Sequence, residues 1–262
     1  MPGNVNVARL GIVTEITLNR PDKANALSQD LVETLLEAVD DAHRDGTRLL
    51  VLRGNGKHFC AGFDLAGVED CSGGDLALRL IRIEALLQML FHAPFATLAL
   101  VHGGVFGAGA DIMVACDARV AHPGTNVRFP GLMFDLVLGV RRLANRIGEE
   151  SARRLLTAGQ AISAEDALAI SLVTMVESRE KWPAIVDETV ANILRLSPRA
   201  TAAMRRRTVQ DTRAEDMAEL ASSTAASDFR DRVIAYRQQT KSSGAPNEHS
   251  PSDKAQQIVN RG

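Results

Sequence analysis

HGGVFGAGADIMVACD, residues 102–117, is the stretch that decides the fold. The apolar run before it, Phe95 to Val101, has the length and flanking residues of a buried strand. Four glycines within seven positions then let the backbone turn sharply and lie against a ligand. The apolar residues Ile112 to Ala115 continue as a buried helix. Because a turn that enters a helix leaves N–H groups unpaired, the stretch favours bound negative charge, for example an oxyanion.

Other interpretations of the same stretch are weaker. Its glycines do not form the G-x-G-x-x-G fingerprint of dinucleotide-binding proteins, and no G-x-x-x-x-G-K-[ST] phosphate loop is present. His102, the glycines and Asp111 interrupt the apolar run well before the roughly 20 residues that a membrane span needs. A tight crossing from strand to helix without any chemistry stays open as an alternative.

Composition narrows the class of protein. With 262 residues, 45% hydrophobic and 24% charged, the chain predicts one large soluble domain, or a domain with a helical appendage. A net charge of −2 gives no indication of a nucleic acid or membrane partner. Three widely spaced cysteines speak against a disulfide framework or a metal site. The first residues lack the basic and apolar regions of a secretory signal, so we expect a cytoplasmic protein.

Hydrophobic periodicity predicts an α/β order in the first half. A helix capped by Ser28 and another over Leu76 to Leu90 alternate with short apolar strands, predicted at residues 5–10, 12–18, 49–52, 95–101 and 118–121. This β-α-β-α-β order indicates parallel strands with helical crossovers. A second glycine-containing loop, Gly54 to Leu65, follows the third strand. Both glycine loops would then stand at carboxyl ends of strands, where such sheets bind ligands.

The second half is predicted to be mostly helical. Ser163 caps one helix, Pro198 suits the first position of another, and Val173 to Val176 forms a short strand. Further helices are expected over residues 140–147, 151–156, 182–196, 198–209, 214–226 and 228–238. The run Arg205 to Arg207 is expected to be a solvated helix face rather than a phosphate site. The polar residues 241–262 predict a mobile tail.

Four ordered segments resemble the crotonase superfamily of enoyl-CoA hydratases and isomerases. They are ITLNRPDKANAL (16–27), FCAGFDL (59–65), residues 102–117, and ISAEDALAISLVTMV (162–176), so the match covers about residues 12–240. The resemblance implies a spiral core of ββα units over residues 1–196 and a helical trimerisation region over 197–240. It also implies a homotrimer or homohexamer that binds acyl-CoA thioesters. Coenzyme A arrives as part of the substrate, so no separate cofactor is expected.

The resemblance also implies the binding residues. Two main-chain amides, those of Phe63 and Ala108, would stabilise an enolate-like oxyanion; removing one such donor costs on the order of 3 kcal/mol in other enzymes. The remaining substrate-binding positions it implies are Lys23, Ala24, Ala61, Asp64, Leu65 and Gly107, with Tyr236 near the adenine of a neighbouring subunit.

Catalytic acids decide the reaction. Hydratases of the family typically use two glutamates, and the first of these positions matches Asp111. Asp111 could instead merely stabilise a helix start. The second position falls on Gly131, which cannot transfer a proton, so two-acid hydration is in doubt. Asp135 is a candidate for the missing carboxylate, and a loop cap is its alternative role.

The prediction is therefore an acyl-CoA-processing enzyme, a hydratase or isomerase, in which Asp111 moves a proton. The alternatives are a non-catalytic acyl-CoA-binding homologue, which Gly131 favours, and a crotonase hydrolase or decarboxylase. Five apolar side chains are candidates for narrowing an acyl pocket, although such residues are usually core: Phe63, Phe106, Phe129, Met133 and Phe134.

Overall fold

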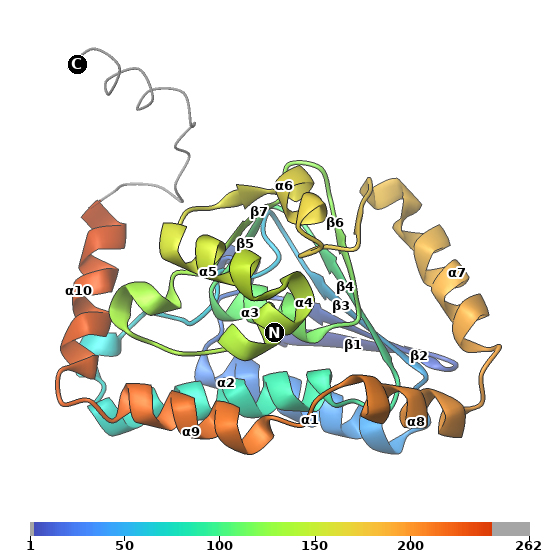
Figure 1. Ribbon diagram of the computed structural model, residues 1–262, viewed down its shortest axis with the longest axis horizontal. Helices are drawn as coiled ribbons and strands as arrows, with labels where there is room; N and C mark the ends of the chain where they lie inside the picture. Colours follow the sequence, from blue (N-terminus) through green and yellow to red (C-terminus); the bar gives the residue numbers. More distant parts are fainter. Residues whose placement is uncertain (1–2, 243–262) are drawn as a thin grey trace, which may run out of the picture.

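A computed structural model describes residues 3–242. The predicted tail, residues 241–262, lies outside them except for its first two residues. Those two residues close the last helix, α10 (Phe229–Ser242), so the predicted end of this helix at residue 238 was wrong. Figure 1 shows a twisted sheet in the middle of the molecule with helices around it.

The main sheet has the predicted parallel topology. Its strands lie in the order β1-β2-β3-β4-β6-β9, namely Val5–Leu10, Val13–Leu18, Leu49–Gly54, Ala96–Val101, Ala118–Ala121 and Met175–Val176. Only β1 is antiparallel to its neighbour; each other pair is parallel. The crossover helices are α1 (Gln29–Arg44), α2 (Gly73–Phe91) and α3 (Ala108–Ala115). The expected β-α-β-α-β order is therefore confirmed.

Alternate side chains of the strands enter two separate cores. Leu50 and Leu52 point toward α1 and α2 in the larger core, whereas Leu49 and Val51 point to the opposite face. Trp182, the first residue of α7 (Trp182–Ile193), covers that opposite face with the apolar side of its helix. Because both faces of the parallel sheet are covered, its strands are apolar along their whole length rather than alternating between apolar and polar residues.

A second, smaller sheet carries the organising stretch. It consists of β5 (Gly104–Phe106), β7 (Asn126–Arg128) and β8 (Ile162–Ser163). Two isolated bridges, between Cys60 and Val105 and between Leu27 and Phe63, extend the pairing of this sheet to the loop of residues 54–65 and to Leu27 before it. Each successive repeat of the chain thus adds one strand to the main sheet and one short stretch of strand pairing to the second sheet. Segments of two or three residues have no readable periodicity, so the sequence did not reveal this sheet.

The second half of the described chain is mostly helical, as expected. Ser28 Oγ accepts a hydrogen bond from Leu31 N at 3.3 Å. Ser163 and Ser197 cap α6 (Ala164–Ala169) and α8 (Pro198–Thr208) in the same way. Pro198 occupies the first turn of α8. The remaining helices are α4 (Val140–Ile147), α5 (Glu149–Ala158) and α9 (Arg213–Thr224). The division at residue 196 stays a prediction.

The expectation of a solvated Arg205 was wrong. Its side chain is buried, its Nε donates to Ala93 O at 2.6 Å, and its guanidinium forms an ion pair with Asp117. Asp117, the last residue of the organising stretch, also accepts from Thr97 N at 3.0 Å. Periodicity alone could not show that α8 turns this residue toward the sheet. Arg206 and Arg207 are exposed, as predicted.

None of the helices within residues 3–242 combines the length and apolarity that crossing a bilayer demands.

Candidate active site

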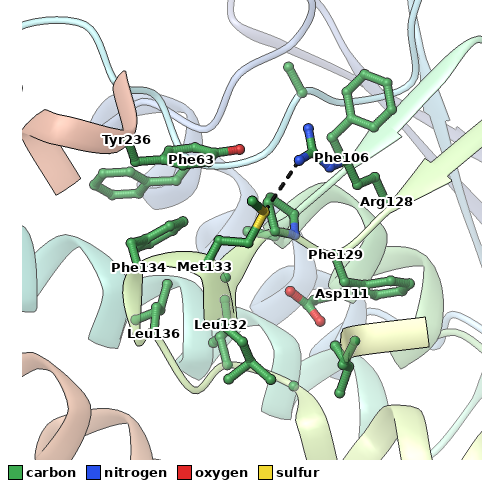
Figure 2. Close-up of a pocket in the computed structure, with 18 of the residues that line it drawn as sticks. Phe63, Phe106, Asp111, Arg128, Phe129, Leu132, Met133, Phe134, Leu136 and Tyr236 are labelled. Carbon is green, nitrogen blue, oxygen red and sulfur yellow. Dashed lines mark hydrogen bonds between the residues drawn. The ribbon is translucent and has the colours of Figure 1, made fainter. Parts of the chain in front are cut away.

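A cavity of about 500 Å³ lies beside the two glycine loops. We call it the central cavity. Its wall comes from both loops, from η3 (Gly131–Phe134) and the chain after it, and from α10. All five apolar residues proposed from sequence line it: Phe63, Phe106, Phe129, Met133 and Phe134. Figure 2 shows these side chains around a common space, with the Asp111 carboxyl pointing into it.

Backbone hydrogen bonds hold the two glycine loops together. Cys60 N donates to Gly104 O at 3.3 Å, and Phe106 N donates to Cys60 O at 3.0 Å. Gly62, at φ 85°, is in the left-handed region that favours glycine. A Cβ atom built on Gly62 would lie 2.5 Å from Phe106 O and 3.2 Å from Ala108 N. The loops therefore approach each other more closely than any other residue type at position 62 would permit.

The amides of Phe63 and Ala108 are both available for a ligand. Among the described residues, neither N–H donates to a protein acceptor, although their neighbours Gly107 N and Asp64 N do. Ala108 is the first residue of α3, where N–H groups lack intrahelical partners. Both residues line the central cavity. Two unpaired donors on adjacent loops can stabilise one developing negative charge.

Two polar side chains that were not among the proposed site residues fix these loops. Asn25 is fully buried at φ 54°, and its Nδ2 donates to the carbonyls of Asn55, His58 and Phe59 at 2.9–3.1 Å. The His58 Nδ1 accepts from Gly104 N at 2.9 Å, and burial lowers the pKa of the imidazole. A neutral ring suits this acceptor role. For Asn25 the sequence did contain a signal, because asparagine in a turn often bonds to nearby backbone groups.

Asp111 is a buried carboxyl on the first turns of α3. Its side chain is 5% exposed, lines the central cavity, and lies against Gly139, where any Cβ atom would collide with it. Burial raises the pKa of Asp111 to about 8; the charge of Arg142 opposes this increase and that of Glu84 adds to it. Among the described residues, no group donates a hydrogen bond to this carboxyl. Asp111 can therefore exchange a proton near neutral pH.

The structure does not bring Asp135 to the central cavity. Asp135 ends η3 in the left-handed region at φ 58°, its side chain is 72% exposed, and it faces Arg232 Nε at 3.4 Å. The proposal of a replacement carboxylate was wrong because the neighbouring Phe134 and Leu136, not Asp135, point inward. Gly131 does line the cavity. Among the described lining residues, Asp111 is thus the one carboxylic acid.

Of the proposed substrate-binding positions before residue 66, some line the cavity and others do not. Ala61 and Leu65 line the cavity, and Ala61 N donates to Ala24 O at 2.9 Å, which joins the two loop positions. Lys23 is exposed and is not a lining residue. The Asp64 carboxylate pairs with Arg20 at 3.0 Å and accepts from Ala66 N, so it stabilises its own loop and joins that loop to the earlier segment around Arg20.

The two other substrate positions both line the cavity. Gly107, at φ 52°, precedes α3 and donates its N–H to Arg128 O at 2.9 Å. Tyr236 of α10 packs against Phe134, with ring centroids 4.8 Å apart. The structure therefore places Tyr236 in the cavity of its own chain; its proposed place near a neighbouring subunit's adenine stays a prediction.

Sequence reasoning also missed Arg128, which lines the cavity from β7. A charged residue directly before the apolar run Phe129 to Phe134 was the available signal. Pro130 and Leu138 likewise line the cavity without having been proposed.

Comparison with known proteins identifies the family and the fold. The model of the family described as "Enoyl-CoA hydratase/isomerase" matches residues 9–243. A crystal structure from Bordetella parapertussis, whose name places it among the enoyl-CoA hydratases/isomerases, superposes with a TM-score of 0.88 at 40% identity. That superposition covers 89% of this chain and 98% of the other.

Two curated relatives carry different activities in their names. The probable enoyl-CoA hydratase echA6 of Mycobacterium tuberculosis is 33% identical over 199 residues, which is 75% of this chain and 78% of that protein. The trans-2-decenoyl-acyl-carrier-protein isomerase of Streptococcus mutans is 31% identical over 246 residues, 87% of this chain and 93% of that protein. The chain thus has the crotonase fold and is a member of the enoyl-CoA hydratase/isomerase family.

Proposed function

We propose that this protein is an acyl-CoA-processing enzyme that moves a double bond within an enoyl thioester. The observation that carries the proposal is that Asp111 is the single carboxylic acid among the described residues lining a cavity that also holds the Phe63 and Ala108 amides, neither of which has a described protein acceptor. Positional isomerisation needs one group that removes a proton and returns it elsewhere, whereas two-acid hydration needs a second group. Gly131 supplies none.

In the proposed reaction the thioester oxygen accepts hydrogen bonds from the Phe63 and Ala108 amides. The Asp111 carboxylate removes a proton from the α-carbon of a 3-enoyl thioester, and the electron pair of the broken C–H bond delocalises onto the thioester oxygen as a dienolate. Asp111, now protonated, returns the proton to the γ-carbon. The double bond then lies between the α- and β-carbons, and the enzyme ends as it began.

The apolar wall supports this assignment. Phe106 and Phe129 would exclude water from the bound chain, which strengthens the hydrogen bonds to the oxyanion and disfavours hydration. The Streptococcus mutans relative is named an isomerase, which also favours the proposal. The rival function is acyl-CoA binding without catalysis, and the absence of a second acid at Gly131 is what favours it.

Turnover of trans-3-hexenoyl-CoA, followed by chromatography and mass spectrometry, tests the proposal. The product should be the 2-enoyl isomer of unchanged mass, and Asp111→Asn should reduce kcat by about 10²- to 10⁴-fold. The matched control is Asp135→Asn, which changes an exposed carboxylate four residues from Gly131 and should retain activity.

Each other outcome has a defined meaning. A product heavier by one water would assign hydration, and thioester binding without turnover would assign the rival function. Full activity of Asp111→Asn would remove Asp111 from the mechanism.

A further inference from the structure

Arg128 has a fixed position next to the candidate oxyanion site. In the parallel pairing of β5 with β7 it is the partner of Phe106, and its carbonyl oxygen accepts the Gly107 N–H at 2.9 Å. Gly107 directly precedes Ala108, whose amide is one of the two proposed donors. The backbone of Arg128 is therefore tied to the loop that would hold the thioester oxygen, and its side chain lines the same cavity (Figure 2).

The guanidinium of Arg128 is oriented but lacks a negative partner. Its Nε donates to Gly159 O at 2.7 Å, and Nη2 lies 3.3 Å from the thioether sulfur of Met133, a weak acceptor. Within residues 3–242 it forms no ion pair. The buried arginines Arg142 and Arg205 differ, because each is paired with a carboxylate.

This arrangement indicates a binding group rather than a structural one. A guanidinium at an apolar wall gains from a bidentate anion, because its remaining N–H groups have a fixed fork geometry. The carbonyl of Gly159 holds the Nε side, and among the described residues Nη1 has no protein acceptor.

Tyr236 provides a second donor at the same end of the cavity. Its ring is held against Phe134, and Figure 2 shows its hydroxyl on the side that faces Arg128. Burial raises the pKa of the Tyr236 hydroxyl, and the positive charge of Arg128 opposes that increase, so the two groups interact. A phenol that stays protonated is a hydrogen-bond donor. An arginine and a phenol together match the oxygens of a carboxylate.

We propose that Arg128 determines specificity by binding a carboxylate at the far end of the substrate's acyl group. The substrate class would be CoA monothioesters of short dicarboxylic acids. This inference rests on the proposed function, because the Phe63 and Ala108 amides must hold the thioester for the acyl group to reach Arg128. The chain must be short because Arg128 lies beside the loop that carries the Ala108 amide.

Binding of matched ligand pairs tests the proposal. Succinyl-, glutaryl- and adipyl-CoA are compared by calorimetry with butyryl-, valeryl- and hexanoyl-CoA, and free CoA is measured alongside. Members of each pair have the same number of acyl carbons and differ in the terminal carboxylate. At least one dicarboxylic thioester should bind the wild-type protein about 10- to 100-fold more tightly than its neutral partner.

The variant Arg128→Met should abolish that preference and leave the affinity for neutral thioesters and free CoA within about twofold. The control is Arg153→Met, which removes an exposed arginine of α5 (74% exposed) and should preserve the preference. Arg128→Lys, which keeps the charge but not the fork, should retain part of it. If Arg128→Met fails to fold, the inference is still tested by the preference of the wild-type protein for dicarboxylic thioesters and by its partial loss in Arg128→Lys.

Three results would overturn the inference. The first is equal binding of every dicarboxylic thioester and its neutral partner. The second is a loss of affinity for free CoA in Arg128→Met as large as the loss for the dicarboxylic thioesters, which would assign the arginine to a CoA phosphate. The third is a preference that survives Arg128→Met. Failure of the wild-type protein to bind any thioester would instead refute the proposed function itself.

Discussion

At the scale of the residue, the properties of Asp111 follow from its loss of water. The carboxyl is almost fully buried beside Gly139, and no described group donates a hydrogen bond to it. Desolvation disfavours the ionised form, so the pKa rises to about 8 although the charge of Arg142 opposes the change. The same aspartate in water would be ionised throughout the physiological range.

The first prediction concerns the pH profile of activity. Because the proposed base must be ionised, kcat/KM for a 3-enoyl thioester should rise with pH and level off above an inflection near pH 8. Initial rates between pH 5 and pH 9.5 check this. An inflection near pH 4 would mean that Asp111 is hydrated in the working enzyme, and a flat profile would exclude it as the base.

The second prediction concerns stability. Below about pH 4, both folded and unfolded protein carry a protonated Asp111, so its burial costs little. Between about pH 4 and pH 8 the unfolded chain loses this proton and the folded chain keeps it, so folding becomes less favourable as pH rises.

Asp111→Asn removes this dependence. Its melting temperature should exceed that of the wild type at pH 8 by at least about 3 °C, with a smaller difference at pH 5. Differential scanning calorimetry at both pH values is the measurement, and Asp187→Asn on the exposed side of α7 is the control. An equal difference in melting temperature between the variant and the wild type at both pH values would show that burial does not shift the pKa of Asp111.

At the scale of the element, the candidate site depends on two loops that only small residues let approach. The pairing of Cys60 with Val105 brings them together, and Gly62 then faces the start of α3. No helix or strand by itself creates the site. It exists where the first turn of α3 meets a loop from the preceding repeat of the spiral.

The third prediction tests this approach. Gly62→Ala places a methyl group 2.5 Å from Phe106 O, so the loops must separate and the two amides must diverge. We expect kcat to fall by about 10²- to 10³-fold, the range seen when an oxyanion donor is lost.

The control for Gly62→Ala is Gly124→Ala. Gly124 has a similar φ of 81°, but nothing lies within 4 Å of an added Cβ. Both variants carry the same backbone strain, but only Gly62→Ala adds a steric clash, so its melting temperature should fall further than that of Gly124→Ala and only Gly62→Ala should lose activity. Equal activity of the two would show that the approach of the loops is not needed for catalysis.

At the scale of the whole molecule, a buried ion-pair network joins three helices distant in sequence. Arg142 of α4 and Glu84 of α2 are paired with both side chains 1% exposed, and Asp216 of α9 lies 3.1 Å from Arg142. Gln88 also donates to Glu84 at 2.9 Å. The network attaches α9 to the core, and the charges of Arg142 and Glu84 also affect the pKa of Asp111.

The fourth prediction concerns this network. Glu84→Gln leaves a buried guanidinium without its main partner, so the free energy of unfolding should fall by about 3 kcal/mol or more. Glu149→Gln breaks an exposed pair with Arg153 and should change it by less than about 1 kcal/mol. Urea unfolding measures both. Equal effects would show that the buried pair contributes no more than a surface pair.

The fifth prediction is assembly. We propose, from the resemblance to the crotonase superfamily, that three or six copies associate through the C-terminal helices. Light scattering of the purified protein should give three or six times the chain mass of 28.2 kDa. A monomeric mass would contradict this proposal and would leave the cavity of the single chain as described.

Much of the fold was readable because its signals are local. Ser28 and Pro198 mark helix starts by their own hydrogen-bonding and steric properties, and the apolar strands are long enough to show that both of their faces are covered. The small sheet was not readable, since β5 and β7 are three residues long. Arg205 was misjudged because its partner Asp117 is 88 positions away.

The sequence by itself determined the α/β order, both glycine loops and Asp111, the aspartate that follows the glycines of residues 102–117. Only the tertiary structure decided that Asp111 is buried with no hydrogen-bond donor in the part of the chain that it describes, that Asp135 faces outward, and that Arg128 lines the cavity. Glycine spacing and helix caps act between near neighbours in the chain, so a sequence displays them. Burial, charge pairing and the direction of a side chain depend on segments that meet only after folding.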